Sequence, residues 1–300
     1  MSPRGCAAIA GEAQEPLEGT APPARRWLLL EVPGAWPRDA LEAQALPERA
    51  RASLRALGAQ LPGLRVQLLR RPGRSTASPR CFVADSGGDS PWLLELQLGS
   101  LEQLPSIDLR AIFEAPEGAG PPPRQRPLHL VCAHGRRDRC CAERGIPVFA
   151  ALQAHAPDDV WESSHLGGHR FAACVLSLPH GLSYGRVLPA QAEALIDAHL
   201  GGELLSLVHL RGRSSLDPWA QAAEIFLRRE HGGRSLAGPR HVEIEALDPG
   251  EAAPSIARVR LELDGIERSI TLRRESMPVT RPPSCGQAPS PAQRFIPQPG

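Results

Sequence analysis

The stretch "LVCAHGRRDRCCAERGIPVFAAL", Leu130–Leu152, places a strand directly before a helix. The apolar run "LHLVC" predicts a buried strand that ends at Cys132, and the segment from about Asp138 to Ala154 predicts a helix interrupted by Pro147. Asp138 is a suitable N-cap residue, so Cys140 and Cys141 are expected to open that helix. Three of the seven cysteines of the chain therefore belong to one strand–helix unit.

The same order of elements is expected twice along the chain. "WLLLEV" (Trp27–Val32) predicts a strand, and a helix over Pro47–Leu61, three short strands and a segment capped by Ser100 follow. The second half repeats this β-α-β-β-β-α order and ends with a helix over Pro189–Leu200. We therefore expect two related α/β units, separated by the Gly/Pro-rich linker "EAPEGAGPPPRQRP" (Glu114–Pro127).

These patterns divide the chain into five segments. Residues 1–24 and the Pro-rich tail, residues 276–300, are expected to be irregular. Residues 25–118 and 126–202 correspond to the two α/β units. Residues 203–275 are expected to form a small C-terminal α+β appendage, because one helical segment precedes three segments of alternating apolar and polar residues.

Composition restricts the classes of partner. The formal net charge is +1, all 34 basic residues are arginine, and only 4% of residues are aromatic, so neither a basic face nor stacking platforms for nucleic acid are predicted. The longest apolar runs are strand-sized and the first residues lack an apolar signal core, so no membrane segment or signal peptide is predicted. Clustered cysteines without the spacing of a disulfide framework favour a cytoplasmic protein with metal or redox chemistry.

A second motif, "SSHLGGH" (Ser163–His169), follows about one helix later. Gly167 and Gly168 disfavour a helix between His165 and His169, which predicts a loop folded closely around a bulky ligand. The three clustered cysteines fit neither the phosphatase spacing nor the C-x-x-C redox motif, and the second cysteine–histidine box of a Rieske centre is missing. Tetrahedral zinc bound by two Cys and two His remains an alternative, as does simple burial of the thiols in the core.

The two motifs together resemble the sucrase/ferredoxin-like family of thioredoxin-like [2Fe–2S] proteins. "LVCAHGRRDRCCAERGIPVFAAL" followed by "WESSHLGGHRFAACVLSLPHGLSYGRV" is similar to the family pattern of Cys, eight residues, Cys and a later His-x-Gly-Gly-His. The similarity extends to "GTAPPARRWLLLEVPGAW" (Gly19–Trp36), "RRPG" (Arg70–Gly73) and the segment Arg211–Glu224. It covers most of residues 19–230.

The resemblance implies a fold and a cofactor. The fold would be two thioredoxin-like (ferredoxin-type) α/β units in tandem plus the appendage, and the second unit would carry a [2Fe–2S] cluster. The cluster ligands would be Cys132, Cys141, His165 and His169, and neutral imidazoles would raise the reduction potential above that of an all-cysteine cluster. The N-terminal unit has "VPGAWPRDAL" at the corresponding positions, which contains no Cys or His. That unit would stabilise the protein or provide a surface for a partner.

The implied function is electron transfer. The protein would be a ferredoxin-like carrier rather than an enzyme, without catalytic residues, and would pass single electrons from a reductase to an acceptor, with proton uptake coupled through the imidazoles. The family name does not establish sugar hydrolysis, because no paired carboxylates are placed for it. The alternatives are a zinc-stabilised interaction module and a thiol-based redox sensor that uses Cys140 or Cys141.

Several residues around the four ligands have open roles. Cys140 is expected to be a spare thiol beside the ligand Cys141. Arginines between the cysteines would offset cluster charge or contact a partner. Cys6 and Cys285 are expected to have no structural role, and the histidines outside the two motifs are expected at the surface. The candidate neighbours of the ligands are His134, Cys140, Gly167, Gly168 and Arg170.

Overall fold

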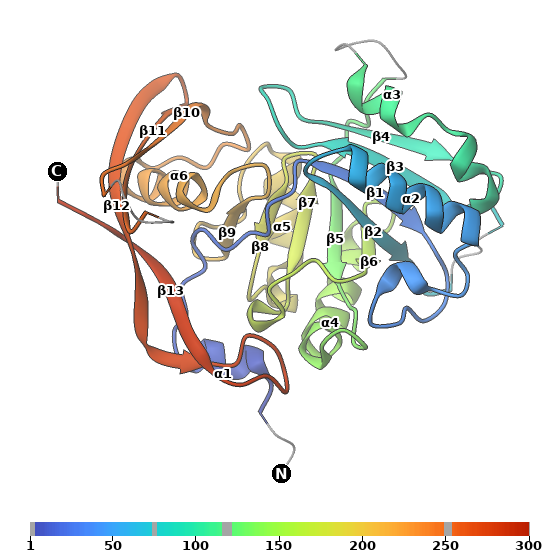
Figure 1. The fold of residues 1–300 in the computed structure, drawn as a ribbon, viewed down its shortest axis with the longest axis horizontal. Helices are drawn as coiled ribbons and strands as arrows, with labels where there is room; N and C mark the ends of the chain where they lie inside the picture. The colour runs from blue at the N-terminus through green and yellow to red at the C-terminus, as the bar shows by residue number, and fades with distance from the viewer. Residues whose placement is uncertain (1–3, 74–76, 116–121, 249–253, 300) are drawn as a thin grey trace.

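The protein has two β-sheets with helices packed against them (Figure 1). The structure, a computed structural model, describes residues 4–73, 77–115, 122–248 and 254–299. A nine-stranded curled sheet carries both of the α/β halves expected from the sequence, and a four-stranded antiparallel sheet follows them. Part of the predicted linker, residues 116–121, lies outside the described residues.

Both halves of the large sheet have the expected order of elements, which is thereby confirmed. In the first half these are β1 (Arg26–Glu31), α2 (Glu48–Gln60), β2 (Leu64–Arg70), β3 (Arg80–Asp85), β4 (Trp92–Gln97) and α3 (Leu109–Glu114). In the second half they are β5 (Leu128–Cys132), α4 (Arg139–His155), β6 (Val160–Ser163), β7 (Val175–Leu178), β8 (Leu182–Tyr184) and α5 (Ala192–Leu200).

The two halves place their corresponding strands in the same order outward from the centre of the large sheet. The sheet runs β4-β3-β1-β2-β6-β5-β7-β8, with β9 (Leu210–Arg213) added at the edge. Within each half, the first two strands are parallel and the third and fourth are antiparallel additions. The halves join through antiparallel pairing of β2 with β6, where Leu69 lies opposite Ser163.

The two faces of the large sheet have different covers. The outer face packs under α2 in the first half, through residues such as Leu28, and under α4 and α5 in the second half, through residues such as Val131. The inner face forms one core shared by both halves, in which Phe82 of β3 meets Trp161 of β6 edge to face with ring centroids 5.9 Å apart. Cys132 belongs to this shared core.

Two local expectations are wrong. Helix α4 is continuous through Pro147, because packing of Val148, Phe149 and Leu152 offsets the one missing backbone hydrogen bond. Ser100 makes no capping hydrogen bond, and the residues after it form a 3-10 helix (Leu101–Ser106) that contains a proline. Asp108 instead caps α3 by accepting a hydrogen bond from the backbone N–H of Ala111 at 2.9 Å.

The C-terminal part of the chain contributes to both sheets. Helix α6 (Pro218–His231) is capped by Asp217, whose carboxylate accepts a hydrogen bond from the Trp219 N–H, and it packs on the second sheet. That sheet contains β10 (Arg240–Ala246), β11 (Ile256–Leu263), β12 (Ile266–Arg281) and β13 (Ser290–Pro297). Figure 1 shows this sheet bending around α6 and its β12–β13 pair reaching α1 (Cys6–Glu12).

Both ends of the chain are therefore more regular than the sequence suggested. The segment 1–24 contains α1, and most of the segment 276–300 belongs to β12 and β13. Proline is tolerated there for two reasons. Pro278 falls in a register shift between Ser276 and Thr280, and β13 is an edge strand that needs no ladder on one side.

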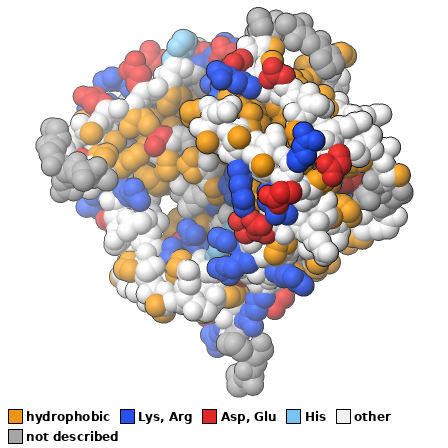
Figure 2. All heavy atoms as spheres, turned by 45° about the vertical axis from the view of Figure 1, so that its right-hand side comes forward, with side chains coloured by type: hydrophobic (Ala, Val, Ile, Leu, Met, Phe, Trp, Pro, Cys, Tyr) orange, Lys and Arg blue, Asp and Glu red, His pale blue; other side chains and the backbone are white. Residues whose placement is uncertain are grey.

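No helix among the described residues is long and apolar enough to cross a membrane. On the face of the molecule shown in Figure 2, arginine and acidic side chains are interspersed, and neither sign of charge forms a continuous field. This distribution agrees with the formal net charge of +1.

Candidate metal centre

The two ligand-type cysteines meet where β5 passes into α4. Cys132 is the last residue of β5, and Cys141 lies in the first turn of α4. Asp138 fixes that turn, because its carboxylate accepts a hydrogen bond from the Cys140 N–H at 2.9 Å. Gly145 lets the helix approach the strand, since a Cβ there would lie 2.1 Å from the carbonyl oxygen of Cys132.

The histidine loop follows β6, at the same edge of the sheet. Gly167 and Gly168 have positive φ angles of 94° and 75°. A Cβ at Gly168 would lie 2.3 Å from the guanidinium of Arg211, which is 1% exposed and donates a hydrogen bond to the Gly167 carbonyl at 3.0 Å. Because these positions carry no Cβ, the buried Arg211 side chain can pack directly against the loop. Arg65 also holds the loop by donating a hydrogen bond to the His165 carbonyl at 3.0 Å.

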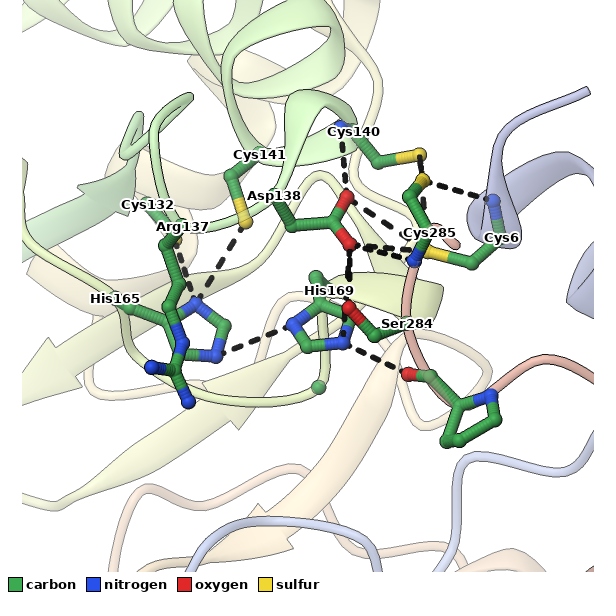
Figure 3. A network of polar contacts seen from close by, with 12 residues as sticks. Cys6, Cys132, Arg137, Asp138, Cys140, Cys141, His165, His169, Ser284 and Cys285 are labelled. Atoms are coloured by element: carbon green, nitrogen blue, oxygen red, sulfur yellow. Dashed lines mark hydrogen bonds and ion pairs between the residues drawn. The ribbon is translucent and has the colours of Figure 1, made fainter. Parts of the chain in front are cut away.

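Three of the four predicted ligands point their donor atoms at one another (Figure 3). The Sγ atoms of Cys132 and Cys141 each lie 3.7 Å from Nδ1 of His165, and the three atoms lie within 4.8 Å of one another. His169 lies alongside rather than within this group. Its ring stacks on His165 with centroids 4.9 Å apart, and its Nδ1 lies 3.3 Å from Nε2 of His165.

Hydrogen bonds define which ring nitrogens carry protons. His169 Nε2 lies 2.7 Å from the carbonyl oxygen of Pro283, which can only accept, so Nε2 carries the proton and Nδ1 carries the lone pair. His165 Nε2 then donates to that lone pair, which leaves Nδ1 of His165 free to face the sulfurs. His165 therefore presents Nδ1 to the sulfurs, whereas the Nδ1 lone pair of His169 accepts the hydrogen bond from His165 and would have to leave it to bind a metal.

The pKa values of the two thiols in the group shift in opposite directions. A hydrogen bond from the Cys141 thiol, supported by the contact with His165, lowers the pKa of Cys132 well below its usual value despite complete burial. The same contact with Cys132, together with burial, raises the pKa of Cys141. Both shifts favour the thiolate at Cys132, and Cys141 would lose its proton when a cation binds.

Access to the group is from the histidine side. Cys132 and Cys141 are 2% and 1% exposed, whereas His165 and His169 are only half-buried. Burial lowers the pKa of His169, which keeps its ring neutral and able to ligate.

The other predicted neighbours have varied places. His134 is buried and donates to the Pro37 carbonyl at 2.7 Å, with its ring edge-on to Trp36, so it joins the β5–α4 loop to the N-terminal half. Arg170 pairs with Glu15 at 2.9 Å and lies over the Phe171 ring rather than facing solvent. Gly167 and Gly168 shape the loop, as described above.

Cys140 faces away from the histidines, because consecutive helical residues point in different directions. Its Sγ lies 3.7 Å from that of Cys6 and 3.5 Å from that of Cys285 (Figure 3). The expectation that Cys6 and Cys285 have no structural role is therefore wrong: both pack against α4. The expectation of surface histidines is also wrong for His129 and His199, which are 1% and 4% exposed.

Fold and site together define an α/β protein with buried Cys/His groups that can bind a metal ion. The chain belongs to the sucrase/ferredoxin-like family, since the model of that family matches residues 17–212. The match includes the large sheet and the Cys132/Cys141/His165/His169 set, and it ends in β9, before α6 and the second sheet. Searches of curated proteins and of solved structures found no match.

Proposed function

We propose that the protein is a ferredoxin-like electron carrier that holds one [2Fe–2S] cluster on Cys132, Cys141, His165 and His169. The convergence of two thiols and an imidazole, with a second imidazole stacked beside them, is the observation that carries the proposal. Two sulfur and two nitrogen donors suit a binuclear iron centre, and membership of the sucrase/ferredoxin-like family supports it. We also infer that the two halves are related units, because their strand orders match, and family membership supports a thioredoxin-like fold for them.

Each part of the site has a role under this proposal. The cluster would supply one-electron redox chemistry, and neutral imidazoles would raise its potential toward the range of about −150 to +300 mV of mixed-ligand centres. The thiols hold the buried end of the site, and the histidines form its accessible end. His169 keeps a proton on Nε2, which donates to the Pro283 carbonyl. A further proton would therefore bind Nδ1 and occupy the lone pair that a metal needs.

Electron donors and acceptors would dock on the accessible end. Arg136 is exposed and Arg137 half-buried in the loop before α4. We propose that a reductase and an acceptor with acidic surfaces bind there, and that the chain itself carries out no substrate chemistry. We also propose a cytoplasmic location, because all seven cysteines are free thiols, as a reducing compartment would keep them.

Spectroscopy of the full chain tests the proposal. Protein purified anaerobically should contain two irons and two labile sulfides per chain. Dithionite should produce the EPR signal of a reduced [2Fe–2S] centre. Cys132→Ala should lose the iron, whereas His169→Cys should retain part of it at a lower potential. A potential independent of pH across the neutral range would remove proton coupling from the proposal.

A zinc centre is the second candidate, and the S···N distances of 3.7 Å favour it. Thiolate sulfur at about 2.3 Å and imidazole nitrogen at about 2.0 Å from a tetrahedral zinc would lie about 3.5 Å apart. Colourless protein with zinc bound to Cys132 and Cys141 and without labile sulfide would establish this reading and refute the cluster.

A further inference from the structure

A second group of metal-ligand residues lies on the opposite side of the α4 N-terminus. It comprises Cys6 of α1, Asp138 and Cys140 at the start of α4, and Cys285 of the loop between β12 and β13. One donor atom from each lies within 4.8 Å of all the others. Figure 3 shows the three thiols gathered around the Asp138 carboxylate, away from the Cys132/Cys141 pair.

The spacing of these atoms matches a tetrahedral zinc site. Sulfur ligands at about 2.3 Å and an oxygen ligand at about 2.1 Å from zinc lie about 3.8 Å (S···S) and about 3.6 Å (S···O) from one another. The Cys6–Cys140 and Cys140–Cys285 sulfurs are 3.7 and 3.5 Å apart, and Cys6 Sγ is 3.7 Å from an Asp138 oxygen. A disulfide would need about 2.05 Å between sulfurs.

The surroundings are built for a tight, enclosed group. Cys6 and Cys140 are each 1% exposed, and Asp138 is 4% exposed. Gly5 makes room, because a Cβ there would lie 2.6 Å from the Cys140 sulfur. Asp138 Oδ2 is held by the Ser284 hydroxyl and the Cys285 N–H at 3.0 and 2.8 Å, while Oδ1 accepts the Cys140 N–H at 2.9 Å and faces the Cys6 sulfur at 3.8 Å.

We propose that Cys6, Cys140, Cys285 and Asp138 bind one structural zinc ion. Three thiolates and a carboxylate are donors that select zinc over hard cations such as Mg²⁺ or Ca²⁺. Their four negative charges exceed the charge of the metal, and the partial positive charge at the N-terminus of α4 offsets part of the excess. Two of the four ligands, Cys6 and Cys285, lie outside the family match to residues 17–212.

The ion would fasten both ends of the chain over the Cys/His group. Cys285 lies two residues after Pro283, whose carbonyl fixes His169, and Asp138 Oδ2 lies 3.9 Å from His169 Nε2. Zinc would therefore hold the contact that defines the tautomer of His169. This inference does not depend on which metal occupies Cys132 and Cys141.

Metal analysis of the full chain, purified anaerobically with and without added zinc, tests the proposal. Wild-type protein should hold one zinc that Cys6→Ala and Cys285→Ala lose while iron and sulfide are retained. Cys81→Ala, which removes a buried thiol far from this group, is the matched control and should keep both metals. Cys132→Ala should lose iron and keep the zinc, so that failure of the two proposals can be told apart.

X-ray absorption at the zinc edge of wild-type protein supplies a readout that needs no variant. It should show three sulfurs at about 2.3 Å and one oxygen at about 2.0–2.2 Å. Three results would overturn the proposal: no zinc uptake by the wild type, equal zinc content in Cys6→Ala and Cys81→Ala, or a Cys6–Cys140 or Cys140–Cys285 disulfide in the anaerobic protein.

Discussion

Replacing Gly145 by alanine tests whether close contact between α4 and β5 sets the position of the candidate ligands. The new Cβ would lie 2.1 Å from the Cys132 carbonyl oxygen, whereas ordinary contact begins at 3.4 Å, so the helix must retreat by more than 1 Å. Both atoms belong to the backbone framework, and we expect the upper end of the overpacking cost, about 3 kcal/mol. Higher helix propensity returns about 1 kcal/mol, which leaves a net loss of about 2 kcal/mol.

Gly58→Ala is the matched control. Gly58 is an exposed helical residue in α2, and a Cβ there meets no atom within 4 Å. It should therefore gain up to about 1 kcal/mol from propensity alone. Urea unfolding monitored by tryptophan fluorescence should separate the two variants by about 3 kcal/mol, and only Gly145→Ala should lower metal content. If Gly145→Ala is as stable as Gly58→Ala, the close-contact argument is wrong.

Three further predictions concern the surroundings of the site. Gly168→Ala should destabilise the protein by about 2 kcal/mol more than Gly202→Ala in urea unfolding, because both have φ near 75° but only the former meets a buried side chain, that of Arg211; equal losses would contradict this. The pKa of Glu15 is lowered, since hydrogen bonds from Arg281 and the charge of Arg170 outweigh burial, so its stabilisation should be present above its usual value of 4.5 and disappear as the pH falls below it. Glu15→Gln should cost about 3–5 kcal/mol at pH 7, and this cost should shrink in acid; a cost independent of pH would refute the ion-pair account. His134→Ala should lower the free energy of unfolding by about 1–3 kcal/mol, because the Pro37 hydrogen bond and the Trp36 contact are lost. The EPR spectrum should stay unchanged, and a shifted spectrum would show that His134 interacts with the metal.

Local chemistry made the strand–helix unit and the histidine loop predictable. Asp138 before Cys140 is a capping signal, and the paired glycines after Leu166 exclude a helix, so the places of Cys132, Cys141 and His165 follow from neighbouring residues. The repeated β-α-β-β-β-α order was readable for the same reason, because buried strands and capped helices are encoded over short windows.

Contacts between distant segments were not readable. Nothing near Cys6 or Cys285 indicates that both pack against Cys140, since this depends on where α1 and the β12–β13 loop are placed by the rest of the fold. The available signal was the number of cysteines left over once two were assigned as ligands. Likewise, prolines made the last segment look irregular, although an edge strand accommodates them.

The position of Cys285 and Pro283 in the chain has a consequence for biogenesis. Both are translated after every strand of the large sheet, so a ribosome-bound nascent chain can fold β1 to β9 while His169 still lacks its carbonyl partner. Only when the β12–β13 loop arrives can the Pro283 carbonyl fix the His169 ring, so the histidine side of the candidate metal centre takes its final arrangement after the large sheet has formed.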